Sequence, residues 1–357
     1  MTEPPRPEGP PSDSDPTTSS GVPKSPSTAD AAAPADPSQP APRTFGLSTF
    51  TIEGRRAPAL FVVGWLATFI GGGIAGLTVL GIGGTVGLIL WVVGLAIATV
   101  GLVLLGGSQA IERRAAGAAY AGPSPFLVFL AVLAASQVAG FAIGWPLSAI
   151  GASIPRPVGD LVGVLVQAAV FAGVIGLMVV AAGALRWSEM GLSRGLGNAT
   201  RGILGGAVFA GPVILVTALV AAVAAQLAGA VPASPLPPTG TTVGLILHLV
   251  AGAIVAPIAE ELLFRGFALT AWRRTYGARG AIVRSSMVFV LAHVLFVGGD
   301  SFRDAASLAF VAGVARIPVA LALGWLFVRT GSLWGPIGLH AAYNAILITL
   351  GEVVAAS

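Results

Sequence analysis

The stretch from Ile203 to Leu227, ILGGAVFAGPVILVTALVAAVAAQL, contains no Asp, Glu, Lys or Arg side chain. About 20 apolar residues in a helix are enough to cross the hydrocarbon core of a bilayer. The stretch from Leu161 to Leu185 is equally free of these charges. Over the 357-residue chain, 55% of residues are hydrophobic and only 10% are charged, whereas a soluble domain carries about a quarter charged residues. The sequence therefore predicts an all-α fold, a polytopic transmembrane helical bundle.

About nine segments have the length and hydrophobicity of membrane spans. They lie near 58–81, 84–106, 125–147, 161–185, 203–228, 244–264, 281–298, 305–328 and 332–351. Arginines concentrate in alternate loops between these segments, and the positive-inside rule places such loops in the cytoplasm. The pattern predicts about nine spans, with the N-terminus inside the cell and the C-terminus outside it.

Residues 1–43 are rich in Pro, Ser, Thr, Asp and Ala and have almost no large apolar side chain to bury, so we expect a disordered tail. Acidic and proline residues stand where a signal peptide would have its basic and apolar regions, so the first hydrophobic segment is expected to be an uncleaved anchor. Lys24 is the only lysine among 19 basic residues, a composition typical of a GC-rich bacterial genome. We therefore expect a bacterial cytoplasmic membrane protein.

Charge and cysteine content exclude several classes of function. The formal net charge is +4, but the arginines lie in short loops between apolar segments rather than on one surface, so we expect no nucleic-acid partner. The chain has no cysteine, which excludes disulfides, a thiolate nucleophile and a cysteine-ligated metal. The expected partners are the lipid bilayer and a protein or peptide substrate.

Ionisable residues inside the predicted spans concentrate in the last third of the chain, and such residues indicate function because they are costly in a membrane. Glu260 and Glu261 are adjacent in one span, so their side chains point about 100° apart on a helix. Arg265 lies four residues after Glu261, the spacing and order that favour a helical ion pair. Glu260 is left without a cation on its own helix and is the candidate general base; the alternative is a pair of interfacial glutamates that reach toward water.

His293 lies within another apolar span, and His340 and Asn344, four residues apart, share one helix face in the last span. A lone buried histidine often only satisfies a backbone carbonyl, but polar residues on separate spans at compatible depth indicate one hydrated cavity. A glutamate and a histidine can hold and deprotonate water, and a second histidine and an asparagine can donate hydrogen bonds to the oxyanion formed on a peptide carbonyl.

Three ordered motifs carry a resemblance to a known family: Glu-Glu-x-x-x-Arg at 260–265, Phe-x-x-x-His at 289–293 and His-x-x-x-Asn at 340–344. The sequence resembles the CPBP family of intramembrane proteases, which comprises type II CAAX prenyl endopeptidases and bacteriocin-processing or immunity relatives. Supporting matches are Phe264-Arg265-Gly266-Phe267, Ser285-Ser286, Arg329 to Trp334, and the loop Glu189-Met190-Gly191-Leu192. The resemblance covers roughly residues 245 to 350.

The resemblance implies an intramembrane endopeptidase that hydrolyses a peptide bond of a membrane-associated protein or peptide. By resemblance, Glu260 is the base, His293 helps hold the water, and His340 and Asn344 form the oxyanion site. Glu261, Arg265 and Phe289 have supporting roles. We expect transmembrane helices 1–5 within residues 44–243, a catalytic core at 244–351 and a short tail at 352–357. The alternatives are a catalytically silent scaffold or immunity factor of the same fold and a transporter.

A metal is the main open question about the chemistry. Glu260, His293 and His340 could form a Zn²⁺ site of one carboxylate and two histidines. The sequence lacks the His-Glu-x-x-His helix that binds zinc and keeps a separate glutamate base, and Asn344 is a poor zinc ligand. We therefore favour catalysis without a cofactor, with Zn²⁺ as the alternative.

Two further ionisable residues lie in the predicted spans. His248 precedes Glu260 by twelve residues on another helix face, and we expect it to have a structural role. Arg316 needs a partner or contact with water, and Asp304 lies too far along the same helix to pair with it. The sequence leaves the role of Arg316 open.

Overall fold

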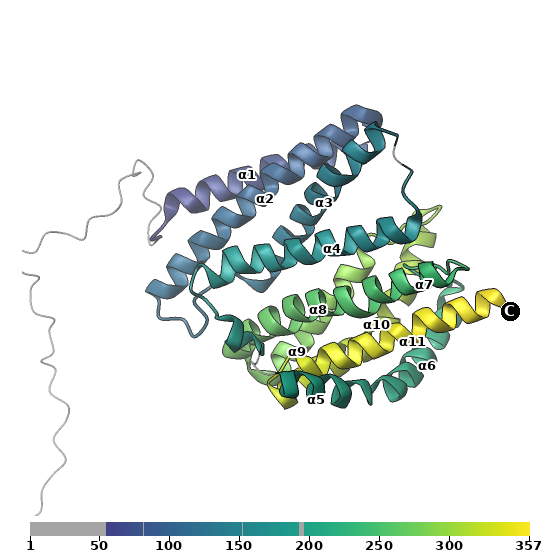
Figure 1. Ribbon diagram of the computed structural model, residues 1–357. Coiled ribbons are helices and arrows are strands. Elements are labelled where there is room, and N and C mark those ends of the chain that lie inside the picture. Colours follow the sequence, from purple (N-terminus) through teal and green to yellow (C-terminus); the bar gives the residue numbers. More distant parts are fainter. Residues whose placement is uncertain (1–54, 81, 152, 193–195) are drawn as a thin grey trace, which may run out of the picture. The chain divides into compact units, whose positions relative to one another are not determined.

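The computed structural model describes residues 55–357 except 81, 152 and 193–195 (Figure 1). The described residues form helices and no strand, which confirms the all-α prediction. The predicted disordered tail, 1–43, lies outside the described residues. The α-helices are α1 (Pro58–Gly76), α2 (Gly84–Ala115), α3 (Pro125–Ala149), α4 (Arg156–Ile175), α5 (Leu196–Ala207), α6 (Ala210–Ala228), α7 (Thr242–Leu249), α8 (Ala256–Glu261), α9 (Thr270–Val294), α10 (Phe302–Thr330) and α11 (Trp334–Ala356).

Short 3₁₀- and π-helices adjoin or connect these elements. The 3₁₀-helices are η1 (Leu77–Leu80) and η3 (Trp187–Met190). The π-helices are η2 (Gly176–Val180), η4 (Val250–Val255) and η5 (Leu262–Leu269). The last two flank α8, which carries both candidate glutamates, and π-helical segments are frequent at functional sites.

Eight helices in the described part of the chain are long and apolar enough to cross a membrane. All but one of them cover a single predicted span. The exception runs from Thr242 to Val294, 53 residues, and covers the two predicted spans 244–264 and 281–298. A straight helix of that length would measure about 80 Å, more than twice the thickness of the hydrocarbon core.

The long helix is broken at Gly277, whose φ of 69° and ψ of −179° are accessible to glycine but not to other residues. Beyond this break the chain folds back. The fold-back is seen in a hydrogen bond that the Ser285 hydroxyl donates to the Phe264 carbonyl at 2.8 Å. The two arms of the helix therefore lie side by side. The eight helices accommodate about nine crossings, while the orientation of the chain in the membrane stays a prediction.

Neighbouring helices pack in a simple order (Figure 1). The first four helices contact one another in sequence, α1 with α2, α2 with α3 and α3 with α4. On the far side of α7 to α11 lie α5, against α11, and α6, against α10. The segment from α7 to α11 thus packs between α4 on one side and the α5–α6 pair on the other, where it is shielded from both directions.

Close contact between α1 and α2 depends on glycine. A Cβ atom on Gly71 would overlap the backbone of Gly94 and Ala98 on α2. Small residues at such positions let two transmembrane helices approach closely and gain dispersion energy, since lipid removes the hydrophobic drive for association.

The ends of the last two helices are well defined. The Ser301 hydroxyl caps α10 by accepting a hydrogen bond from the Asp304 amide, and Gly331, with φ of 64°, ends the same helix. Helix α11 continues to Ala356. The region predicted as a tail, 352–357, is therefore helical except for its last residue, because the apolar pattern persists beyond Gly351.

Candidate active site

The five candidate residues come from three elements that the fold brings together. Glu260 and Glu261 are the last two residues of α8, and His293 is the penultimate residue of α9. His340 and Asn344 lie one turn apart on α11. The fold-back at Gly277 brings α9 beside η5, which directly follows α8, and α11 contacts α8.

Glu260 faces both histidines. Its Oε2 atom lies 3.8 Å from His293 Nε2 and 3.9 Å from His340 Nε2. Oε2 is buried and has no hydrogen-bond partner among the described residues, although the side chain as a whole is 19% exposed. Both distances are too long for a direct hydrogen bond but allow one water molecule to bridge the atoms.

The remaining ring nitrogens fix the tautomers of the two histidines. His293 Nδ1 lies 2.8 Å from the Phe289 carbonyl oxygen, an acceptor, so Nδ1 carries the proton. His340 Nδ1 lies 2.8 Å from Glu261 Oε1, and the same reasoning applies because a carboxylate only accepts. In the neutral histidines, both Nε2 atoms are therefore lone-pair acceptors directed at the Glu260 carboxylate region.

Glu261 has a different environment from its neighbour. It forms the predicted ion pair with Arg265, with Oε1 2.9 Å from Nη1, and both side chains are 0% exposed. Arg265 Nη2 also donates to the Ala320 carbonyl of α10 at 3.2 Å. Glu261 Oε2 and Arg265 Nε have no partner among the described residues. Glu261 thus holds His340 and connects α8 to α10 through Arg265, which sequence spacing alone did not reveal.

Phe289 packs against most of the site. Its ring centroid lies 4.5 Å from that of His293 and 5.9 Å from that of His340, and the Arg265 guanidinium carbon lies 4.4 Å above the ring. Phe264 meets it edge-on at 5.2 Å. Because Phe289 is 2% exposed and contacts both imidazoles, it fixes the plane of each ring.

Asn344 has a structural partner that depends on the π-helix η4. The Ala256 amide donates to Ala251, five residues earlier, and the next amide in this series would donate from residue 257 to Gly252. Residue 257 is proline and has no N–H. The Asn344 side chain takes its place, since Nδ2 donates to the Gly252 carbonyl at 2.7 Å. One of the two Asn344 N–H groups is therefore engaged in holding η4 to α11.

The loop Glu189-Met190-Gly191-Leu192 packs against both η5 and the start of α11. The Gly191 carbonyl accepts from the Leu333 amide at 3.0 Å, and Met190 is fully buried against Gly266. Glu189 accepts hydrogen bonds from the Arg186 amide and from Arg274, both at 2.7 Å. The hydrogen bond from the Arg186 backbone N–H, and to a smaller extent the one from Arg274, holds the pKa of Glu189 below its usual range.

Other sequence candidates lie outside this cluster. His248 Nε2 forms a hydrogen bond with Asp160 Oδ2 of α4 at 3.1 Å, which supports the structural role expected for it. Ser285, part of one of the supporting matches, ties α9 to η5 by donating a hydrogen bond to the Phe264 carbonyl.

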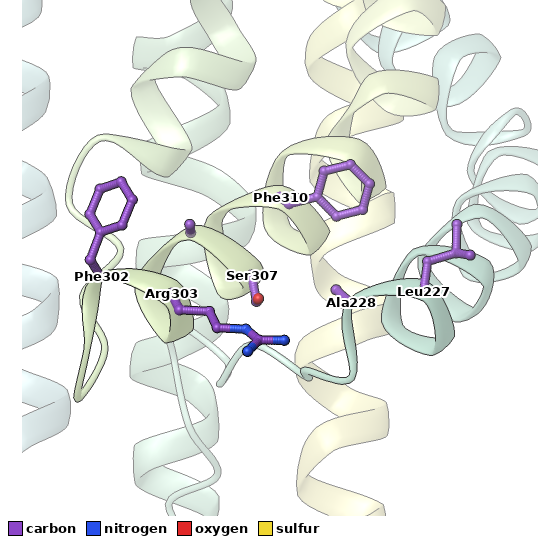
Figure 2. Close-up of a pocket in the computed structure, with 7 residues that line it drawn as sticks. Leu227, Ala228, Phe302, Arg303, Ser307 and Phe310 are labelled. Atoms are coloured by element: carbon purple, nitrogen blue, oxygen red, sulfur yellow. The ribbon is translucent and has the colours of Figure 1, made fainter.

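Two cavities lie elsewhere in the described chain. One, of about 510 Å³, lies between the end of α6 and the start of α10; Figure 2 shows Arg303 extending toward Ala228 there, flanked by Phe302 and Phe310. The other, of about 590 Å³, is lined by residues of α1, α2 and α3 and by Arg55 and Ser124 beside them. None of the candidate catalytic residues lines either cavity.

The donor chemistry of Glu260, His293 and His340 suits Zn²⁺, and the bond from Glu261 to His340 resembles those that orient zinc-bound histidines. The spacing is wider than a zinc site requires. Two ligands of a tetrahedral zinc lie about 3.4 Å apart, against 3.8 and 3.9 Å here. Within the described residues, no group of three or more His, Asp or Glu side chains has the geometry to hold a metal ion. The three side chains would have to move closer together to bind one.

Comparison with known proteins identifies the segment that holds the candidate catalytic residues. Residues 242–346 match the model of the type II CAAX prenyl endopeptidase Rce1-like family. Comparisons with curated proteins and with solved structures found no match. The match spans α7 to the middle of α11 and contains Glu260, His293, His340 and Asn344. We conclude that this is an integral membrane protein and that its residues 242–346 are similar to the Rce1-like family of type II CAAX prenyl endopeptidases, whose members are intramembrane proteases.

Proposed function

We propose that this protein is an intramembrane endopeptidase that hydrolyses a peptide bond of a membrane-associated protein or peptide with water activated by Glu260. The observation that carries the proposal is the buried Glu260 Oε2, which lacks a protein partner and faces two imidazole Nε2 atoms at 3.8 and 3.9 Å. Three acceptors that converge in this way suit a molecule that donates protons to them, and water is such a molecule.

The first step is attack on the scissile carbonyl. Water donates one hydrogen bond to Glu260 and another to Nε2 of His293, so the lone pairs of its oxygen stay free to attack. As the carbon–oxygen bond forms, Glu260 accepts a proton and the carbonyl electron pair moves onto the carbonyl oxygen. Asn344 supports this oxyanion with its second N–H group.

The second step breaks the peptide bond. The carbonyl re-forms, the carbon–nitrogen bond cleaves, and the leaving nitrogen takes the proton from Glu260. The products are one carboxylic acid and one amine, and Glu260 returns to its starting state; transfer of the acid's proton to the amine then gives a carboxylate and an ammonium group. His340 joins the oxyanion site only when Nε2 also carries a proton, and the Glu261 carboxylate at Nδ1 stabilises that charged form.

The test compares membranes that contain the full-length protein with membranes that contain Glu260→Gln. Quantitative peptide mass spectrometry should detect new protein termini only with the unaltered protein. Glu112→Gln is the matched control. Glu112 lies on α2, pairs with Arg55 at 2.9 Å and, among the described residues, forms no hydrogen bond or ion pair with a residue of the site. Cleavage that persists in Glu260→Gln, or flux of a substrate without cleavage, would overturn the proposal in favour of a scaffold or a transporter.

A further inference from the structure

Arg316 is a charged residue near the middle of a transmembrane helix. It lies 14 residues from either end of α10 (Phe302–Thr330), or about 21 Å from each end at 1.5 Å per residue. An arginine at this depth stays protonated and is costly to keep there, so a function is expected of it. Its Nη1 donates to the Ala312 carbonyl of the same helix at 2.8 Å. In the part of the chain that the structure describes, no carboxylate lies within 4.0 Å of its guanidinium.

The packing of α10 directs this part of the helix toward the site. Gly313 lies against Val290 and Val294 of α9, the residues on either side of the turn that carries His293. Arg316 follows Gly313 by three residues and precedes Ala320, which binds Arg265, by four, so the three share one helix face. This packing places Arg316 on the side of α10 that faces the turn of α9 carrying His293.

Among the described residues of the site, the other cationic groups are bound to the Glu261 carboxylate. Arg265 is completely buried and is held by Glu261 and the Ala320 carbonyl. His340 is held by the same carboxylate through Nδ1, and Asn344 spends one N–H group on Gly252. The guanidinium of Arg316 has five N–H donors, and one hydrogen bond to Ala312 leaves most of them available.

We propose that Arg316 is a catalytic residue whose guanidinium donates hydrogen bonds to the oxyanion that forms on the scissile carbonyl oxygen. This inference rests on the proposed endopeptidase function and adds a residue outside the three sequence motifs. During attack, negative charge leaves the Glu260 carboxylate as it accepts the proton, and appears on the carbonyl oxygen. A cation on the face of α10 that packs against this turn of α9 lowers the energy of the charge transfer with little reorganisation, because it is already oriented.

The experiment measures kcat and KM for Arg316→Ala, Arg316→Lys and the unaltered protein, purified at full length and reconstituted in phosphatidylcholine liposomes. Arg284→Ala is the matched control, because Arg284 makes the same bond to its own helix, from Nη1 to Gly280 at 3.1 Å, at an exposed site. Arg316→Ala should lower kcat about 100- to 1000-fold, the effect of losing one oxyanion donor, with KM changed by less than about threefold. Arg316→Lys should keep part of the rate, and Arg284→Ala should keep all of it.

Two further measurements separate a catalytic role from a structural or substrate-binding one. Added guanidinium chloride at low concentration should restore part of the rate of Arg316→Ala but not that of Glu260→Gln. Arg316→Ala should lower kcat by the same factor for a peptide with a free carboxyl terminus and for the same peptide with an amidated one. An unchanged kcat, a loss without guanidinium rescue, or a loss confined to KM on the free carboxylate would overturn the assignment. If the unaltered protein cleaves while Glu260→Gln does not, the endopeptidase function stands in any of these cases.

Discussion

Replacing Asn344 by alanine should reveal two roles of one side chain. In the structure its amide substitutes for the N–H group that Pro257 lacks, by donating to the buried Gly252 carbonyl at 2.7 Å. A buried carbonyl left without a donor costs about 1–3 kcal/mol, so Asn344→Ala should lower the free energy of unfolding by that amount. The same change removes one of the donors to the oxyanion and should lower kcat about 100- to 1000-fold.

Pro257→Ala separates these effects, because it supplies an amide N–H to the Gly252 carbonyl. In the Pro257→Ala background, Asn344→Ala should cost less than about 0.5 kcal/mol, the scatter expected of independent changes, while the loss of kcat should be as large as before. The free energies come from reversible denaturant unfolding of the four proteins in detergent, and the rates from peptide cleavage in liposomes. An equal stability loss in both backgrounds would refute the proposed replacement of the proline amide.

The two adjacent glutamates should behave differently: Glu261→Gln, which breaks a fully buried ion pair, should lose about 3–5 kcal/mol of stability, whereas Glu260→Gln should unfold like the unaltered protein and show only background cleavage. Similar behaviour of the two variants in melting and cleavage assays would count against the division of roles. Because hydrogen bonds lower the pKa of Glu189 in the folded state, its stabilising contribution should be present above pH 4.5, its usual pKa, and disappear as the pH falls through the lowered value. Melting curves of Glu189→Gln should lack this acidic dependence, and an unaltered profile would contradict it. A reporter fused after Arg279 should lie in the cytoplasm and one fused after Ser357 outside it; the same location for both would overturn the orientation.

Local spacing predicted the parts of the site that lie on one helix. The ion pair between Glu261 and Arg265 follows from their separation of four residues on one helix. Hydropathy predicted the membrane helices because about 20 consecutive apolar residues are what a helix needs to cross the hydrocarbon core. The contact between Glu261 and His340 could not be predicted in this way, because 79 residues separate them and only the packed bundle brings them together.

Backbone irregularities account for most of what the sequence did not reveal. The engagement of Asn344 with Gly252 depends on a π-helix, and nothing in Val250–Val255 distinguishes it from an α-helix before Pro257 is considered. Gly277 is one of 49 glycines, so its part in folding the long helix back could not be singled out. Arg316 stood out as an ionisable residue in a span, but its position beside the site required the packing of α10 on α9.

The central claim is that Glu260 activates water without a metal, and one assay tests it most directly. Purified full-length protein is depleted of metal with a chelator, its residual metal is measured by elemental analysis, and cleavage of a peptide is followed in liposomes beside Glu260→Gln. We predict that the metal-depleted protein keeps cleaving while Glu260→Gln does not. Near-stoichiometric zinc in the untreated protein, lost on substitution of Glu260, His293 or His340, with activity abolished by chelation and restored only by added metal, would contradict the account.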